Sequence, residues 1–220
     1  MLNLTIDNLL CRTKDYAFCH IPKNGGTNFK HVAQWEGDKG IGYIYNIYNL
    51  RHQIPSWFES EFDFHPKEWI CITRNPYSRM VSWWAYSKQR ANSMDSTRIT
   101  RMKPIVDRIA NATFEEFVNE NYASLLDSIK QSLPNFPDWQ YKISWKTTSL
   151  QLRWVLDVPN MRTFPLENPT LIEEYTGLPF TKTHKNTTKH EEWNTYYTDA
   201  LREKVYIKYK ADFEQLGYTP

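Results

Sequence analysis

The sequence lacks the features that mark several large classes of protein. No apolar run reaches the ~20 residues that a membrane-spanning helix needs, so we expect no membrane span. The N-terminus has neither a basic leader nor a long apolar stretch, and it therefore does not match a signal peptide. The formal net charge is only +2, which argues against a nonspecific nucleic-acid binder, because such proteins need a strongly basic surface.

Cysteine is scarce, and its placement argues against a metal site. The chain has three cysteines, Cys11, Cys19 and Cys71, and neither they nor any other His/Cys/Asp group shows the spacing of metal ligands. Cys19 and Cys71 lie in apolar, β-prone runs, where we expect buried, reduced thiols. These features predict a cytoplasmic protein without a bound metal.

The pattern along the chain predicts an α/β fold. The 220 residues suffice for one domain with a sizeable core, and no repeat or low-complexity linker divides them. Apolar runs at 16–21 and 69–73 predict strands, and helical patterns follow at 24–35 and 76–90. This alternation favours a single domain, 1–220, with a central parallel sheet flanked by helices.

Further helices are expected in the C-terminal half. Thr113 and Glu116 form a capping box that starts a helix through about residue 130. Another helix is expected within 146–156, and a short one follows Asn168-Pro169 and ends at Gly177. The last helix is expected to pack one face on the core, because apolar residues recur there at helical spacing: Leu201, Val205, Tyr209, Phe213 and Leu216.

The most informative segment is the turn at residues 21–28, between a predicted strand and a predicted helix. Two adjacent glycines let backbone N–H groups approach an anion closely, and Lys23 adds a positive charge. A strand, a tight glycine turn and a helix N-terminus form a P-loop-like phosphate cradle, although an ordinary strand-to-helix turn is the alternative. The residues expected at the anion are Lys23, Asn24, Gly25, Gly26, Thr27 and Asn28.

The turn does not match the two common nucleotide-binding motifs. In the P-loop, G-x-x-x-x-G-K-[ST], a lysine and a hydroxyl residue follow the glycines, whereas Lys23 precedes them here. The dinucleotide fingerprint G-x-G-x-x-G differs in spacing. The turn is therefore expected to hold a phosphate-like group without the chemistry of those families.

A second anion site is predicted where the run at 69–73 ends. Asn75 is a good N-cap and Pro76 suits the first helical position, so a helix is expected to start there. Arg74 at the strand end and Ser82 on this helix can grip one oxyanion from two sides. The planar arginine fork suits phosphate because it forms two parallel hydrogen bonds.

Together the two segments resemble the sulfotransferases, and in particular the carbohydrate branch that includes the heparan sulfate 2-O-sulfotransferases and their bacterial and viral relatives. Those enzymes carry a P-K-x-G-G-T loop for the 5′-phosphosulfate of PAPS (3′-phosphoadenosine 5′-phosphosulfate) and an R-[DN]-P-x-x-R-x-V-S segment for its 3′-phosphate. Residues 22–27 and 74–82 match them in the same order. Softer similarity extends to the C-terminus, but the Golgi members also carry a membrane anchor, and this sequence departs from them there.

The resemblance implies transfer of a sulfuryl group from PAPS to a hydroxyl of an acceptor, for which a carbohydrate is the expected class. Lys23 is then expected at the sulfonate or bridging oxygens. A histidine, with its ordinary pKa of ~6.5, suits the base that takes the hydroxyl proton. In the 2-O-sulfotransferases this histidine lies shortly before the strand that leads to the 3′-phosphate arginine. By this analogy His52, which precedes Arg74 at a similar separation, is the expected base.

Other residues can take part or be purely structural. The remaining histidine candidates for the base are His20, His65 and His184, and a carboxylate base is the alternative to a histidine. Glu167, in the segment 164–168 that resembles the family's short strand and acidic turn, can orient substrate or form a turn. Arg79 supports the nucleotide site or forms an ion pair. The further candidates for the 3′-phosphate, which can equally be solvated, are Lys182 and Lys185.

Two other functions are compatible with the residues. A small nucleotide or metabolite kinase of related fold needs a hydroxyl residue directly after a P-loop lysine, and this turn lacks one. The second is a catalytically inactive module that binds nucleotide or glycan. The acceptor is expected at the loops 36–66 and 91–145. The basic residues that can meet an acidic glycan, or simply face solvent, are Arg90, Arg98, Arg101, Lys103 and Arg108.

Overall fold

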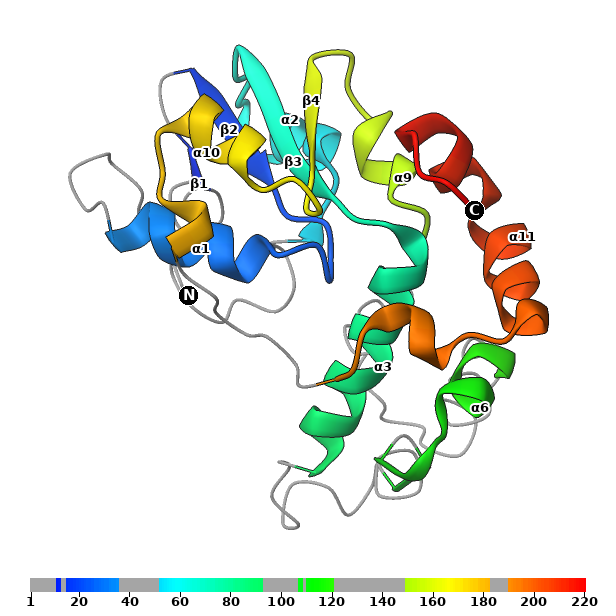
Figure 1. Cartoon of the computed structure of the whole chain (residues 1–220). Coiled ribbons are helices and arrows are strands. Elements are labelled where there is room, and N and C mark those ends of the chain that lie inside the picture. The colour runs from blue at the N-terminus through cyan, green and yellow to red at the C-terminus, as the bar shows by residue number, and fades with distance from the viewer. Residues whose placement is uncertain are drawn as a thin grey trace, which may run out of the picture.

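The computed structural model describes residues 11–12, 15–35, 52–92, 107–108, 110–120, 149–182 and 190–220. Within these ranges the chain forms one four-stranded sheet with helices on both faces (Figure 1). None of the helices in these ranges is long and apolar enough to cross a membrane.

The sheet is parallel except at one edge. Its strands are β1 (Cys11–Arg12), β2 (Tyr16–Cys19), β3 (Glu68–Thr73) and β4 (Met161–Pro165), in that spatial order. The strands β2, β3 and β4 run parallel, which confirms the predicted α/β fold, and the unpredicted β1 pairs antiparallel with β2. Because parallel strands end at the same edge, the chain segments that follow β2, β3 and β4 are neighbours in space.

Alternate residues of the strands face two separate cores, as a pleated strand requires. On one face, Ile70 and Ile72 pack against the helices α1 (Gly26–Trp35) and α10 (Thr170–Thr176) and the turn η3 (Phe180–Lys182). On the other face, residues of β2 and β3, among them the two buried cysteines Cys19 and Cys71, pack with α2 (Pro55–Phe62) and α9 (Leu152–Val155). The burial of these two thiols is as predicted, and it raises the pKa of both.

A third, aromatic-rich core lies beside the sheet. It joins α3 (Pro76–Asn92), α6 (Phe114–Asn119), η4 (Trp193–Tyr196) and α11 (Asp199–Leu216). In Figure 1, α3 leads away from the end of β3. The helix α11 contacts both α3 and α9. Four of the five residues in the predicted stripe of α11 are buried, and Leu216 is half-buried.

Several predicted helix ends are confirmed by their capping contacts. The Asn75 side chain accepts the N–H of Tyr77 at 2.9 Å, and Pro76 opens α3. Thr113 forms the predicted capping box at α6, although residues 121–130 of that predicted helix lie outside the described part. Gly177 ends α10 with a φ of 68°, a conformation that glycine adopts without strain.

Two predicted helices differ in extent from the structure. The helix predicted from residue 24 begins at Gly26, because residues 22–25 form a turn in which Lys23 and Gly25 have positive φ. Within the segment 146–156 the described helix is only α9, and residues 146–148 are not described.

Candidate functional site

The turn after β2 is closed tightly by its own backbone. The Gly25 carbonyl accepts the N–H groups of Asn28 at 2.9 Å and Phe29 at 3.1 Å, which starts α1. Gly25 has a φ of 78°, and a Cβ added there would lie 2.9 Å from the side chain of Leu166. Lys23 has a φ of 71°, which is uncommon and strained for a residue with a side chain. The N–H groups of Gly26 and Thr27, the first two residues of α1, have no partner within the helix and are potential anion donors.

Gly26 is required for a different reason, the approach of His20. A Cβ at Gly26 would lie 2.1 Å from Cδ2 and 2.4 Å from Nε2 of the His20 ring, so only glycine fits. The His20 ring in turn meets the His52 ring edge-on, with 4.4 Å between the ring centroids. The structure therefore places His52, the predicted base, next to His20, whose ring packs against the turn at Gly26.

The hydrogen bonds of His52 define which ring nitrogen can take a proton. Its Nδ1 lies 2.9 Å from the His20 carbonyl oxygen. A carbonyl only accepts, so we assign the hydrogen of the neutral ring to Nδ1 and the lone pair to Nε2. The carbonyl of His52 itself accepts the indole N–H of Trp154 at 3.1 Å, which fixes the backbone of this residue.

Arg74 lies directly against the turn at residues 22–25. Its Nη1 donates to the Lys23 carbonyl at 3.1 Å, and its Nε donates to Ser78 Oγ at 2.9 Å. Burial, and secondly the nearby Arg74 charge, lower the pKa of Lys23 to about 7. Burial lowers the pKa of Arg74 to about 10, although the charge of Glu167 opposes this shift. Two cationic side chains that are close together and shielded from water repel each other, so a bound anion would stabilise them.

One face of α3 contacts both of these cations. Ser78 contacts Arg74, and the Tyr86 ring lies under the Lys23 ammonium, 3.8 Å from Nζ to the ring centroid. Ser82 is four residues from each, so it lies on the same face of the helix, and it is buried. Ser78 was not predicted from the sequence, although its spacing of four residues from Arg74 was a signal for it.

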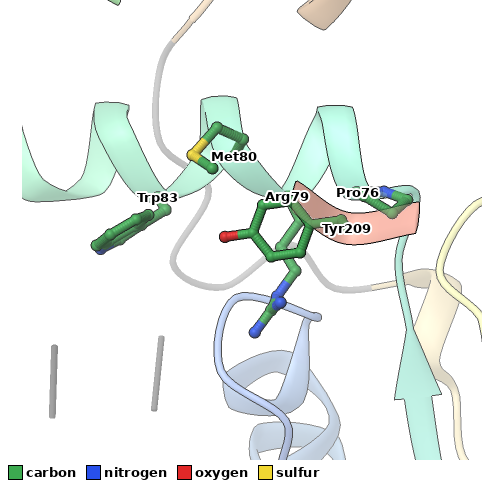
Figure 2. Close-up of a pocket in the computed structure, with 5 residues that line it drawn as sticks. All are labelled: Pro76, Arg79, Met80, Trp83 and Tyr209. Atoms are coloured by element: carbon green, nitrogen blue, oxygen red, sulfur yellow. The ribbon is translucent and has the colours of Figure 1, made fainter. Parts of the chain in front are cut away.

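Arg79, also on α3, supports the turn through backbone carbonyls. Its Nε donates to the Pro22 carbonyl at 3.2 Å and its Nη1 to the Ser149 carbonyl at 2.8 Å. Figure 2 shows Arg79 leaving α3 beside the Tyr209 ring and pointing toward the blue ribbon of the turn and α1. These contacts brace the turn, and the part of Arg79 in a nucleotide site stays a prediction. The small hollow in Figure 2 is lined by Pro76, Arg79, Met80, Trp83 and Tyr209.

The side chains of Asn24 and Asn28 are turned into the protein. Asn24 donates through Nδ2 to the Ile72 carbonyl at 2.8 Å and to Gln151 Oε1 at 2.6 Å. Asn28 donates to the Phe180 carbonyl at 3.0 Å. Both residues are buried, and a buried amide requires such partners. These side-chain amides are therefore occupied in bracing the turn.

Gln151 and Asp212, which no sequence motif indicated, connect the turn to Arg74. Gln151 Oε1 accepts from the Arg74 N–H at 2.8 Å as well as from Asn24, and its Nε2 donates to the Arg74 carbonyl at 2.7 Å. Asp212 of α11 accepts the N–H groups of Gln151 at 2.8 Å and Leu152 at 3.0 Å. Burial raises the pKa of Asp212, although these two hydrogen bonds oppose the shift.

Glu167 anchors the segment that carries Arg74. Its carboxylate accepts the N–H of Asn75 at 2.8 Å and the hydroxyl of Tyr218 at 3.3 Å. The Tyr218 hydroxyl also lies 2.9 Å from Thr73 Oγ1, at the end of β3. Glu167 thus links the segments after β3 and β4 at the carboxyl edge of the sheet.

The other predicted site residues lie apart from this cluster or outside the described part. His65 is exposed and lies near Glu59 and Asp63, and Lys182 is exposed at the end of η3. Arg108 pairs with Glu120. In the described ranges no three His, Cys, Asp or Glu side chains are placed to hold a metal ion. The side chains outside the described part are those of His184, Lys185, Arg90, Arg98, Arg101 and Lys103.

Comparisons with known proteins identify the family. A search of curated proteins and a search of solved structures each gave no significant match. The family model described as "Sulfotransferase family" matches residues 8–219, which is nearly the entire chain. The protein therefore belongs to the sulfotransferase family.

Proposed function

We propose that this chain is a single sulfotransferase domain that transfers the sulfuryl group of PAPS to a hydroxyl of a carbohydrate acceptor. Membership of the family supports sulfuryl transfer in general. One observation carries the more specific proposal: Arg74 donates to the carbonyl of Lys23, so the arginine expected at the 3′-phosphate and the lysine expected at the phosphosulfate are joined in one cationic site. A nucleotide with phosphate groups at both ends suits such a pair.

The residues around the turn fit the proposed donor. Lys23 and the N–H groups of Gly25, Gly26 and Thr27 would hold the 5′-phosphosulfate, because backbone N–H groups at a helix N-terminus are suited to an anion. The 3′-phosphate would be held by Arg74 and Ser82. Asn24 and Asn28, through their buried amides, would keep the turn in this conformation.

In the proposed reaction, His52 Nε2 takes the proton of the acceptor hydroxyl as its oxygen bonds to sulfur. The bond between sulfur and the oxygen of the 5′-phosphate breaks, and adenosine 3′,5′-bisphosphate leaves with the electron pair on that oxygen. The ammonium of Lys23 and the N–H groups of the turn stabilise the charge that gathers there. His20 holds His52 Nδ1–H through its carbonyl, which keeps Nε2 as the accepting nitrogen.

The two alternatives make different demands on the site. An inactive binding module would explain the cations Lys23 and Arg74. It would not explain why the ring tautomer and the backbone of His52 are both held by hydrogen bonds. A kinase needs a hydroxyl residue directly after a P-loop lysine, and Lys23 is followed by Asn24. These two arguments favour a sulfotransferase over a binding module and over a kinase.

The proposal is tested in two steps. Thermal unfolding is measured with adenosine 3′,5′-bisphosphate and with ATP-Mg, and the protein is then incubated with radiolabelled PAPS and a panel of glycans, glycolipids and small alcohols. We expect stabilisation by the bisphosphate and label transfer to a glycan. Stabilisation by ATP-Mg alone would favour the kinase, and bisphosphate binding without transfer to any acceptor would favour the binding module.

A further inference from the structure

We infer that Gln151 is a positioning residue that sets the separation between two phosphate anchors, the turn at Lys23 and the Arg74 side chain. The inference rests on the proposed function, because it assigns Gln151 a role in recognising a nucleotide with phosphates at both ends. Gln151 stands 77 residues after Arg74 and 127 residues after Asn24, yet its side chain bonds to both. Gln151 is fully buried.

The amide of Gln151 holds the backbone of Arg74 on both sides. Its Oε1 accepts the Arg74 N–H at 2.8 Å, and its Nε2 donates to the Arg74 carbonyl at 2.7 Å. Both polar groups of the residue are thereby fixed, much as a neighbouring strand would fix them. Because these two backbone groups are held, the Cα–Cβ bond from which the Arg74 side chain extends keeps one direction.

The same amide oxygen holds the phosphate turn. Asn24 donates to Gln151 Oε1 at 2.6 Å and to the Ile72 carbonyl at 2.8 Å, so the residue next to Lys23 is tied to the end of β3. One carbonyl oxygen therefore receives a hydrogen bond from each anchor segment. A movement of either segment must break a buried hydrogen bond and leave a buried polar group without a partner.

Gln151 is itself held by α11. Asp212 accepts the N–H groups of Gln151 and Leu152, and α11 packs on α3 and α9. Arg79 adds a parallel link, because it joins the carbonyls of Pro22 and Ser149. The separation of the anchors is thus set from the C-terminal helix.

The chemistry of the position accounts for glutamine. Asparagine is shorter by one carbon–carbon bond, about 1.5 Å, and cannot reach both segments. Glutamate has no donor for the Arg74 carbonyl and would add a second buried carboxylate near Asp212. Methionine matches the length of glutamine but forms none of the three side-chain hydrogen bonds.

A correct separation matters most for a ligand that uses both anchors at once. When one phosphate is bound, the second meets its anchor at a high effective concentration only if the distance fits. A nucleotide with one phosphate does not depend on that distance. The ratio of dissociation constants for adenosine 5′-monophosphate and adenosine 3′,5′-bisphosphate therefore reports the positioning role, and a general loss of stability would not change it.

The test is calorimetric titration of the full chain and its variants with both nucleotides. We expect the ratio to fall about tenfold in Gln151→Met, and to fall also in Gln151→Asn, which decides the question if the methionine variant does not fold. The control is Asn160→Ala. Asn160 also donates to backbone carbonyls, those of Pro66 and Lys67, but it lies at the amino ends of the strands, away from the turn. The control variant should leave the ratio unchanged.

The possible results separate the inference from the proposed function. A wild-type protein that binds both nucleotides equally refutes the proposed donor. A wild-type preference for the bisphosphate that persists unchanged in both Gln151 variants overturns the role of Gln151 and leaves the donor assignment intact.

Discussion

The two ends of the parallel sheet are held by different kinds of interaction. At the carboxyl end, buried amides and arginines bond to backbone groups, as Asn24 does to Ile72 and Arg79 to Pro22. At the amino end, exposed ion pairs dominate: Lys67 with Asp15 at 3.0 Å and Arg162 with Glu68 at 2.9 Å. The same sheet thus has one rigid, desolvated end and one solvated end.

The difference has an energetic meaning. Exposed ion pairs contribute little, because water and salt screen them and long side chains lose entropy. Buried polar networks are costly to break, because each lost partner leaves a desolvated group. The buried polar contacts, which are costly to break, therefore lie at the end of the sheet where the proposed chemistry needs fixed geometry. Substitutions at the two ends should differ sharply in their effects on ligand binding and activity.

The largest expected effect is on turnover at the carboxyl end. His52→Ala should lower kcat by about 10³-fold, because a general base typically contributes 10²–10⁴-fold, while binding of adenosine 3′,5′-bisphosphate is kept. The measurement is steady-state kinetics with PAPS and the acceptor found in the panel. His65→Ala, at an exposed histidine, is the matched control and should keep full activity. Full activity in His52→Ala would remove His52 from the mechanism.

The next effect concerns the charge of Lys23. Lys23→Met should weaken bisphosphate binding by about 100-fold at pH 6.5, since a charged hydrogen-bonding group is lost. The wild-type affinity should fall as pH rises through 7, because the pKa of Lys23 is lowered to about 7 and the ammonium loses its proton there. Titrations at several pH values test this, and a pH profile that is the same in both proteins would contradict it.

The same shift predicts an opposite trend for the stability of the protein without ligand. The unfolded chain keeps the Lys23 proton up to about pH 10.4, while the folded chain loses it near 7. Between these values the unfolded state binds more protons, so this residue makes stability rise with pH. Lys23→Met should flatten that contribution in urea unfolding measured at pH 7 and pH 9.

The smallest effect is expected at the amino end of the sheet. Lys67→Ala removes an ion pair in which both side chains are largely exposed, so it should shift Tm by no more than about 2 °C and leave nucleotide binding unchanged. Differential scanning calorimetry and one titration check both statements. A large loss of binding there would mean that the two ends are coupled, and the contrast between them would fail.

Much of this fold follows from local sequence patterns. The strands β2 and β3, the turn and the cap at Asn75 each depend on residues close together in the chain, which is why sequence predicted them. The direction of the Asn24 side chain was not predictable, because a motif gives a position in a turn and not the partner that a buried amide finds.

The braces between distant segments could not be predicted. Gln151 meets Asn24 across 127 residues, and Asp212 meets Gln151 across 61. No periodicity or local spacing connects such residues, and only the packing of α9 and α11 beside β3 brings them together. The two-residue strand β1 was missed because it is too short to show an alternating pattern.

The central claim is that Lys23 and Arg74 hold opposite ends of one nucleotide. Calorimetric titration of Arg74→Ala with adenosine 3′,5′-bisphosphate and with adenosine 5′-monophosphate tests it most directly. We predict that the wild-type protein prefers the bisphosphate and that Arg74→Ala binds both nucleotides with similar, weak affinity, because only the anchor for the 3′-phosphate is removed. An Arg74→Ala variant that keeps the wild-type preference for the bisphosphate would contradict the account.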